Sequence, residues 1–496
     1  MSDHPQTTHE SELSRPRRLL VLGICCMSLL VVGLDATIVN VALPSIHRSL
    51  HASLSGLQWT IDAYTLVLAS LLMLAGSTAD RIGRRMVFQT GLAIFGLASL
   101  LCALAPTLGL LIAARVLQAI GGAMLNPVAM SIIRNVFEDP RERAQAIGLW
   151  GAVFGLSMAL GPVLGGVLVD ASNWRLVFLV NVPVTIVAII LTALFVPESR
   201  APHPRRVDPV GQVLVIVALS SLTYAIIEGG DRGWLTAEIL GLFALSAIAF
   251  VVLVLYELRR REPLIEVRFF RSLPFAGASA IAVCVFASIG GFLFLNTLYL
   301  QGVRGLSPLD AGLYMLPMAV PMLVLAPISG RLVGSRGARI PLMVGGAAIT
   351  AGALMLTRLS RTTPEAYLFA SYVIFGAGTS FVNPPITNTA VSGMPPSQAG
   401  VASAVASTSR QVGSTLGVAV MGAVAGGATA AALGAGFASA THVAWWITVG
   451  LGVTVVCLGY LTTTAWADRT AQATAELLSE QPQPRAPEPE RVGAAA

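Results

Sequence analysis

Leu34-Asp35-Ala36-Thr37-Ile38-Val39-Asn40 lies inside an apolar run that extends from about residue 19 to residue 43. A helix needs ~20 predominantly apolar residues to cross a bilayer, so this run is long enough to span a membrane. A carboxylate within such a run is costly to keep in lipid, and it is a functional-site hypothesis by default. The stretch therefore predicts a membrane protein whose function depends on Asp35.

The composition of the whole chain is that of a membrane protein. Of its 496 residues, 55% are hydrophobic and 11% are charged, and the mean hydropathy is +0.76. A soluble domain carries about 25% charged residues. The 31 residues counted as Lys or Arg are all arginine. Because a Walker A loop needs a lysine on the nucleotide phosphates, the chain by itself is not an ordinary ATP-driven pump.

Thirteen further apolar runs follow the first, and together they predict fourteen membrane-spanning helices. Only helices or closed barrels satisfy their backbone hydrogen bonds in lipid, and runs of this length are helices. The expected fold class is therefore an all-α polytopic membrane protein. The further runs cover approximately residues 57–77, 86–105, 107–133, 144–168, 177–196, 209–228, 237–257, 274–300, 310–333, 340–357, 366–387, 399–424 and 442–464.

The placement of the arginines predicts the orientation of these helices. With the N-terminus inside, 23 arginines fall in cytoplasmic segments and six fall outside, whereas Arg115 and Arg410 lie within spans. Cytoplasmic loops of membrane proteins carry such an excess of basic residues. We therefore expect a multi-pass protein of the cell (inner or plasma) membrane with both termini in the cytoplasm. The net charge of +6 follows from this asymmetry, so no nucleic-acid partner is expected.

The sequence also contains an internal repeat. Gly76 and Gly330 begin related segments 254 residues apart, and Asn126 and Asn383, each followed by proline, are 257 residues apart. Two related halves around a site near the bilayer midplane are typical of secondary transporters. The expected domains are a cytoplasmic N-terminal tail (1–18), an N-terminal six-helix bundle (19–196), an inserted helix pair with cytoplasmic linkers (197–273), a C-terminal six-helix bundle (274–464) and a cytoplasmic, partly disordered tail (465–496).

A loop motif identifies a family to which the chain is similar. The segment Gly76-Ser-Thr-Ala-Asp80-Arg81-Ile-Gly83-Arg84-Arg85 resembles a motif of the major facilitator superfamily. The six-plus-two-plus-six layout over about residues 19–464 resembles its fourteen-span drug:proton antiporter family. The resemblance implies a major facilitator fold that exports small amphipathic compounds in exchange for protons. We expect a monomer whose partners are substrate, protons and the lipid bilayer, without a cofactor.

The same motif supplies the candidates for a gate on the cytoplasmic side. The resemblance implies that Asp80, Arg81 and Arg84 form a charge latch that closes the inner side in one state. The alternative is a solvated charge run that only anchors the topology. Gly334 replaces Asp80 in the second copy of the motif, so a latch would depend on the N-terminal half.

Three charged residues are candidates for proton coupling. At ~1.5 Å per residue, Asp35 and Arg115 each lie ~12 Å from the expected outer face, so Arg115 can approach Asp35 or the proton path. The alternatives are an Asp35 that only packs helices and an Arg115 in a purely structural ion pair. Asp62, near the outer end of the second span, is a second proton-site candidate or a solvated acid. The resemblance matches Asp35 and Asn40 to a motif of drug:proton antiporters, and Arg115 to a fourth-span arginine linked to proton transfer.

A glycine stripe in the fifth expected span is a candidate hinge or seal. Small residues spaced by four, such as Gly161 and Gly165, let helix backbones approach closely. Pro162 lacks a backbone donor and permits a kink. Gly155 belongs to a second set of small residues spaced by four, with Gly151 and Ala159, and generic helix packing is the alternative reading for the whole segment. The Gly161-Pro162 pair, followed by glycines at 165 and 166, resembles the motif that marks exporters in the superfamily.

Polar residues inside or at the ends of the spans are candidates for the substrate cavity. They are Asn40, Tyr64, Gln118, Asn296, Tyr299, Asn383 and Arg410. Arg410 either holds an anionic or polar substrate group, or pairs with a carbonyl, Asn383 or Asn388. The clear charges within spans are two acids and two arginines, and this balance favours neutral or zwitterionic substrates.

The function predicted from these observations is proton-coupled efflux of small amphipathic organic compounds such as antibiotics. A proton-coupled exporter of an endogenous metabolite or lipid shares every motif and is the first alternative. A membrane sensor or scaffold that transports nothing is the second. The sequence has no nucleophile elbow, Rossmann fingerprint or metal-ligand spacing, so neither an enzyme nor a metal site is expected.

Overall fold

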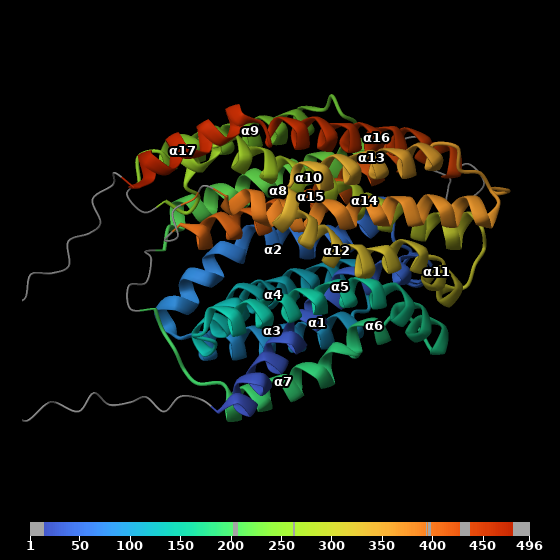
Figure 1. Cartoon of the computed structure of the whole chain (residues 1–496). Coiled ribbons are helices and arrows are strands. Elements are labelled where there is room, and N and C mark those ends of the chain that lie inside the picture. Colours follow the sequence, from blue (N-terminus) through green and yellow to red (C-terminus); the bar gives the residue numbers. More distant parts are fainter. Residues whose placement is uncertain are drawn as a thin grey trace, which may run out of the picture.

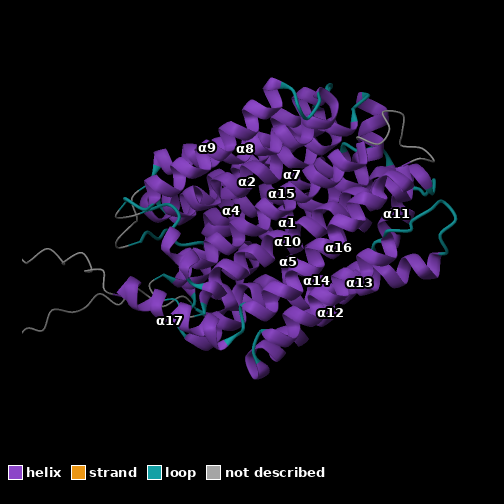
Figure 2. Ribbon diagram, turned by 90° about the horizontal axis from the view of Figure 1, so that it is seen from above, coloured by secondary structure: helices purple, strands orange, loops and turns teal. Residues whose placement is uncertain are grey.

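The computed structural model describes residues 14–201, 207–260, 263–392, 394, 398–426 and 437–479, and within them it contains helices and no strand (Figure 2). Of the tails expected at 1–18 and 465–496, residues 1–13 and 480–496 lie outside the described residues, whereas residues 15–18 already belong to the first helix. The first helices are α1 (Arg15–Leu50), α2 (Leu54–Ile82), α3 (Arg84–Leu104), α4 (Leu108–Val136), α5 (Pro140–Ala171), α6 (Leu176–Leu179), α7 (Asn181–Phe195), α8 (Pro209–Arg232) and α9 (Ala237–Glu257). The chain continues with a 3-10 helix, η1 (Val267–Arg271), and then with α10 (Leu273–Leu298) and a π-helix, η2 (Tyr299–Val303). The last helices are α11 (Pro308–Tyr314), α12 (Leu316–Arg336), α13 (Arg339–Leu356), α14 (Glu365–Val391), α15 (Ala399–Gly426), α16 (Phe437–Leu461) and α17 (Ala465–Ser479).

The number of apolar helices is lower than the sequence predicts. Among the described residues, 12 helices are long and apolar enough to cross a membrane. Two further helices, α14 with 27 residues and α15 with 28, have a sufficient length but a more polar sequence, and they are not among these. The structure therefore gives twelve candidate spans, and the count of fourteen stays a prediction.

Two of the expected spans are interrupted. The run at 177–196 forms α6 and α7, and the run at 310–333 forms α11 and α12. Pro183 and Pro317 lie just after the two interruptions. Because proline has no backbone N–H, it cannot donate to the carbonyl four residues earlier, and the helical hydrogen-bond pattern breaks there.

The helices pack in two sets that repeat the same pairing. In the first set, α1 packs on α5, α2 on α4, and α3 on both α4 and α7. In the second set, α10 packs on α15, α12 on α14, and α13 on both α14 and α16. Figure 1 shows the first set in blue to green below the second set in yellow to red. This is the pairing that two related halves would produce.

The helix pair between the two sets packs along their junction. Helix α8 contacts both α2 and α15, whereas α9 contacts α8. Two side-chain hydrogen bonds fix α8 to α2: Trp59 Nε1 donates to Glu228 Oε1 at 2.9 Å, and Gln212 Nε2 donates to the Ser70 carbonyl at 2.6 Å. The pair is therefore attached to the side of the molecule where the first set meets the second.

The two sets are joined at one end of the molecule. We call it the arginine-poor end, because it corresponds to the expected outer segments with their few arginines; it holds the turns at 51–53, 172–175 and 304–307. The opposite, arginine-rich end holds the turns at 83 and 337–338, which are flanked by Arg81, Arg84, Arg336 and Arg339. Gln58 Nε2 donates across the junction to the carbonyls of Val418 (3.1 Å) and Ala419 (2.8 Å). A Cβ on Gly166 would lie 2.6 Å from Leu309 Cα, so α5 and α11 touch through their backbones. Glycine at this position is what permits the close approach.

Helix α17 was not anticipated in the segment assigned to the C-terminal tail. It packs against η1 and the start of α10, where Thr470 Oγ1 accepts a hydrogen bond from the Leu273 N–H at 2.9 Å. Leu478, in its last turn, is buried in a cluster with Phe269 and Phe275. The described part of the tail is therefore attached to the second set of helices.

Candidate functional site

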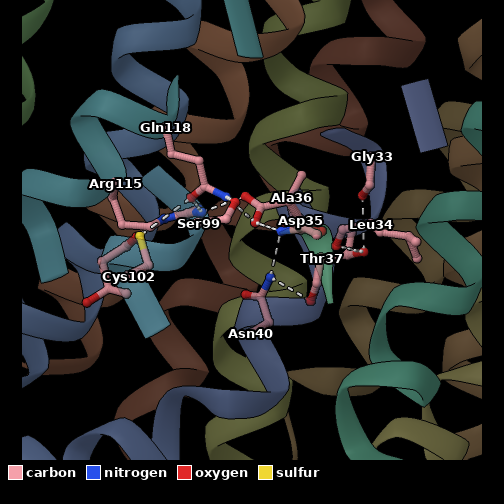
Figure 3. Close-up of polar contacts among 12 residues, drawn as sticks. Gly33, Leu34, Asp35, Ala36, Thr37, Asn40, Ser99, Cys102, Arg115 and Gln118 are labelled. Atoms are coloured by element: carbon pink, nitrogen blue, oxygen red, sulfur yellow. Dashed lines mark hydrogen bonds and ion pairs between the residues drawn. The ribbon is translucent and has the colours of Figure 1, made fainter. Parts of the chain in front are cut away.

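Asp35 and Arg115 form an ion pair in the interior of the first set of helices (Figure 3). Arg115 Nη1 lies 2.5 Å from Asp35 Oδ2, and the side chains are 1% and 0% exposed. Arg115 Nε donates to the Thr60 carbonyl at 3.1 Å. The structure thus brings together the two residues that the matching depths in α1 and α4 placed at one level.

Amide side chains complete the coordination of the carboxylate. Asp35 Oδ1 accepts hydrogen bonds from Gln118 Nε2 at 2.8 Å and from Asn181 Nδ2 at 3.0 Å. Gln118 also accepts from Arg115 Nη1 at 2.6 Å and donates to Ser99 Oγ at 2.8 Å. An ionised carboxylate can only accept hydrogen bonds, and here both of its oxygens have donors. The site is therefore complete for the charged form of Asp35.

Local structure explains how these side chains converge. Arg115 and Gln118 are three residues apart on α4, so they lie on the same helix face. Asn181 is the first residue of α7, directly after the interruption that precedes Pro183. Sequence reasoning expected Gln118 in the substrate cavity and missed Asn181 and Ser99. An amide inside the apolar run 177–196 is a signal that could have identified Asn181.

Aromatic rings enclose the guanidinium group. Arg115 Cζ lies 4.2 Å from the centroid of the Tyr64 ring and 5.6 Å from that of Phe178. Both rings are fully buried, so Tyr64 belongs to this enclosure and does not line a cavity. A cation over an aromatic face is stabilised most where water is excluded. The ion pair is therefore shielded from solvent as well as hydrogen-bonded to its neighbours.

The carboxylate of Asp35 connects three helices, since it contacts α4 through Arg115 and Gln118 and α7 through Asn181. Protonation would remove the negative charge and turn one carboxyl oxygen into a donor. Arg115 would then be a buried cation without its counter-charge, which is strongly destabilising. Loss of either charge would therefore weaken the contact between α1 and α4.

Asp62 is a second fully buried carboxyl group. It is 0% exposed, so the expectation of a solvated acid is wrong. Its Oδ1 accepts from Thr65 Oγ1 at 3.4 Å, and Thr65 Oγ1 accepts from Thr415 Oγ1 at 2.9 Å. Asp62 Oδ2 has no partner among the described residues. Counting from the end of the run made Asp62 shallow, but α15 covers this face of α2.

A cavity of about 80 Å³ lies between the two sets of helices. Four of its lining residues come from α5 and seven from α10, α12 and α14: Gly151, Phe154, Gly155, Met158, Phe286, Ile289, Met322, Ala326, Thr379, Ser380 and Asn383. Of the residues proposed from the sequence for the substrate cavity, Asn383 lines it. The candidate hinge residue Gly155 lines it as well.

Three other cavity candidates lie elsewhere. Asn40 donates only within its own helix, to the carbonyls of residues 36 (3.4 Å) and 37 (3.3 Å). Asn296 Oδ1 accepts from Tyr372 OH at 2.6 Å, inside the second set. Tyr299 OH donates to the Ser360 carbonyl at 2.7 Å, near the arginine-poor end. Asn296 and Tyr299 thus bind to other segments of the second set, and none of the three residues is among those that line the cavity.

Arg410 lies beside the cavity. Its Nη2 donates to Thr387 Oγ1, and its Cζ is 5.9 Å from the centroid of the Phe286 ring, which lines the cavity. The buried Nε atom has no partner among the described residues. Neither Asn383 nor Asn388, the amides considered from the sequence, is its hydrogen-bond partner.

The other candidate hinge residues pack α5 against two helices. A Cβ on Gly165 would lie 2.8 Å from the Ile38 carbonyl of α1, and one on Gly161 would collide with Thr37. The Pro162 carbonyl is in contact with Gly312 of α11. The stripe on α5 therefore connects the helix that carries Asp35 with the second set.

The charges of the loop motif are engaged within the first set. Arg84 Nε donates to Asp80 Oδ1 at 3.0 Å, and the Ala201 N–H donates to the Asp80 carbonyl at 3.0 Å. Glu198 Oε1 accepts from the Arg85 N–H at 3.0 Å. Arg81 is exposed. These contacts close the turn between α2 and α3 onto the segment that follows α7.

Known proteins similar to this chain are named for drug resistance or drug efflux. Multidrug resistance protein Stp of Mycobacterium tuberculosis H37Rv is 37% identical over 82% of this chain and 76% of its own length. The methylenomycin A resistance protein of Streptomyces coelicolor is 36% identical over 79% and 82%. The multidrug efflux pump LfrA of Mycolicibacterium smegmatis is 34% identical over 86% and 84%.

A solved structure shares the fold. The crystal structure of a bacterial homologue of the human lysosomal transporter Spinster, inward-facing and unoccupied, matches with a TM-score of 0.65 at 20% identity, over 93% of this chain and 99% of that one. Residues 25–418 match the family model of the Major Facilitator Superfamily. With its two similarly paired sets of helices, the chain belongs to the Major Facilitator Superfamily.

Proposed function

We propose that the protein exports small amphipathic organic compounds, antibiotics among them, in exchange for protons. The similar proteins are named for multidrug efflux and for resistance to individual antibiotics. The observation that carries the coupling to protons is the buried contact between Asp35 and Arg115. It places a carboxylate that can gain a proton beside a cation that responds to the loss of charge.

The proposed topology has fourteen spans, with α14 and α15 included. Both termini and the arginine-rich end then face the cytoplasm, in agreement with the excess of basic residues there. The bundles 19–196 and 274–464 rock against each other, and the insertion 197–273 stays at their junction. The transporter works as a monomer in the cell membrane.

The proposed cycle begins from an arrangement that is joined on the outer side. Gln58 and the contact of α5 with α11 hold that side together. A drug-sized ligand needs a pocket of roughly 300–1,000 Å³, so the cavity of about 80 Å³ must widen before substrate binds. The sets therefore separate at the arginine-rich end to admit substrate from the cytoplasmic side.

A proton at Asp35 then drives the change of access. Loss of the ion pair displaces α1, and α1 packs on α5 through Gly161 and Gly165. Helix α5 in turn contacts α11 and lines the cavity. One proton that moves down 100 mV supplies ~2.3 kcal/mol, which is enough for modest export. Asp80, Arg81 and Arg84 form the cytoplasmic latch of this cycle, and Asp62 is a second proton site.

The test is substrate-triggered proton release from proteoliposomes, with a panel of antibiotics and dyes. The wild type is compared with Asp35→Asn and with Asp231→Asn, which changes an exposed acid at the end of α8. We expect release with the wild type and with Asp231→Asn, and none with Asp35→Asn. Release that survives in Asp35→Asn would move the coupling site to Asp62. Silence across the panel would favour a metabolite exporter or a protein that transports nothing.

A further inference from the structure

Arg115 lies on α4 and Arg410 on α15, which we propose as a span, but their surroundings differ. Arg115 donates to Asp35, Gln118 and the Thr60 carbonyl. Arg410 donates to one neutral hydroxyl, that of Thr387. No acidic side chain pairs with Arg410 in the described part of the chain, and its Nε atom is buried without an acceptor. An unpaired cation at such a position is costly, so it requires a counter-charge from elsewhere.

The guanidinium group lies beside the central cavity, next to one of its lining residues. It is 5.9 Å from the ring of Phe286, which lines the cavity from α10. Its partner Thr387 is four residues after Asn383, a lining residue, so the two lie on the same face of α14. Thr379 and Ser380 add hydroxyl groups to that wall. The cavity therefore has an apolar wall, a neutral polar wall and a cation at their border.

The acids of the spans do not neutralise this cation. Asp35 is paired with Arg115 inside the first set. Asp62 is enclosed where α2 meets α15, and its hydrogen bond is to Thr65. Neither lines the cavity. The balance of charges in the sequence therefore does not apply around the cavity, because its lining residues are uncharged and the cation Arg410 lies next to one of them.

We propose that the cavity binds amphipathic compounds that carry an ionised acid group such as a carboxylate. Arg410 holds the acid, Phe286, Ile289 and Met322 contact the apolar body, and Asn383 offers an amide to a polar substituent. A guanidinium group presents a planar pair of donors that matches a carboxylate. This assignment rests on the proposed export function and names the substrate class of that same site. It replaces the preference for neutral or zwitterionic substrates that the sequence suggested.

An acidic substrate changes the energetics of the exchange. When one proton enters and one anion leaves, both movements carry charge in the same direction. A potential of 100 mV multiplies the attainable gradient by ~50-fold for each charge that moves. Export of an acid is therefore more sensitive to the membrane potential than export of its neutral amide.

The test measures binding of three related fluorescent probes to the purified full-length protein. Dansyl-phenylalanine carries the acid, its amide is neutral, and dansylcadaverine is a cation. We expect the wild type to bind the acid most tightly. Arg410→Gln should weaken binding of the acid by roughly 10- to 100-fold, as charge-assisted hydrogen bonds predict, and leave the amide unchanged. Arg410→Lys should retain part of the preference for the acid over the amide. Arg358→Gln, which changes an exposed arginine elsewhere in the chain, should retain all of that preference.

The outcomes separate this proposal from the export function. Equal binding of the acid and the amide by the wild type, tighter binding of the cation, or no binding of the acid overturns the proposal. If Arg410→Gln fails to fold, Arg410→Lys replaces it in the comparison. A smaller difference between the affinities for the acid and the amide than in the wild type then supports the proposal, and an unchanged difference overturns it. Proton release by dansylcadaverine alone would keep proton-coupled export and overturn the acid preference. Acid binding that depends on Arg410 without any proton release would keep the site and overturn the coupling.

Discussion

The energetic coupling between Asp35 and Arg115 provides the sharpest test of the site. The perturbation is a double-mutant cycle of Asp35→Asn, Arg115→Gln and the two together. Asparagine keeps the volume of Asp35 and an oxygen that can accept from the two amides, so the single variant removes the negative charge and places a donor where Arg115 had an acceptor. Arg115 would then remain buried with Gln118 and the Thr60 carbonyl as acceptors.

The magnitude follows from the burial of both groups. Removal of one member of a buried ion pair costs about 3–5 kcal/mol, because the other charge stays behind in a dry site. The side chains here are 1% and 0% exposed. The double variant has no charge left to solvate, so its loss should be smaller than the sum of the single losses. We expect a coupling free energy of ~2 kcal/mol, within the range for residues in direct contact.

The assay is the free energy of unfolding of the purified protein in mixed micelles of increasing SDS content. The exposed pair of Arg232 and Glu238, with atoms 2.7 Å apart, is the matched control. A cycle of Arg232→Gln and Glu238→Gln should show no measurable coupling, because solvent screens exposed pairs. Additive losses at Asp35 and Arg115, within ~0.5 kcal/mol, would refute the ion pair as the organising contact.

Three further predictions concern the junction and the carboxylate. Gly166→Val adds a side chain where a Cβ would already be 2.6 Å from the backbone of α11, so it should separate the two sets at the arginine-poor end. The separation should speed thiol labelling at position 415 in a Thr415→Cys variant without the native cysteines. Gly148→Ala should leave the rate unchanged, because a Cβ there would have nothing within 4 Å. Gln58→Leu removes two hydrogen bonds across the same junction and should also speed labelling; an unchanged rate would show that packing alone holds it. Asn181→Leu removes a donor from the buried carboxylate and should lower the free energy of unfolding by ~1–3 kcal/mol, so an unchanged value would contradict that contact.

Much of the site could be predicted because depth in a membrane is nearly a one-dimensional property. The positions of Asp35 and Arg115 within their runs placed both at one level, and the structure pairs them. Direction around the helix axis is a different matter. Tyr64, Gln118 and Asn296 were assigned to the cavity from their polarity, but their faces point to other helices. Depth gave no information on which neighbour each face would meet.

The sequence by itself determined an all-helical membrane protein with related halves and a charged pair in its first half. Those properties depend on the length of apolar runs, on the distribution of arginine and on repeated motifs, which are local or periodic along the chain. Only the tertiary structure decided that Asn181 completes the carboxylate site, that Asp62 is buried beneath α15, and that Arg410 borders the cavity. The reason is physical: these outcomes depend on which helix faces pack together, and packing joins residues that are distant in sequence.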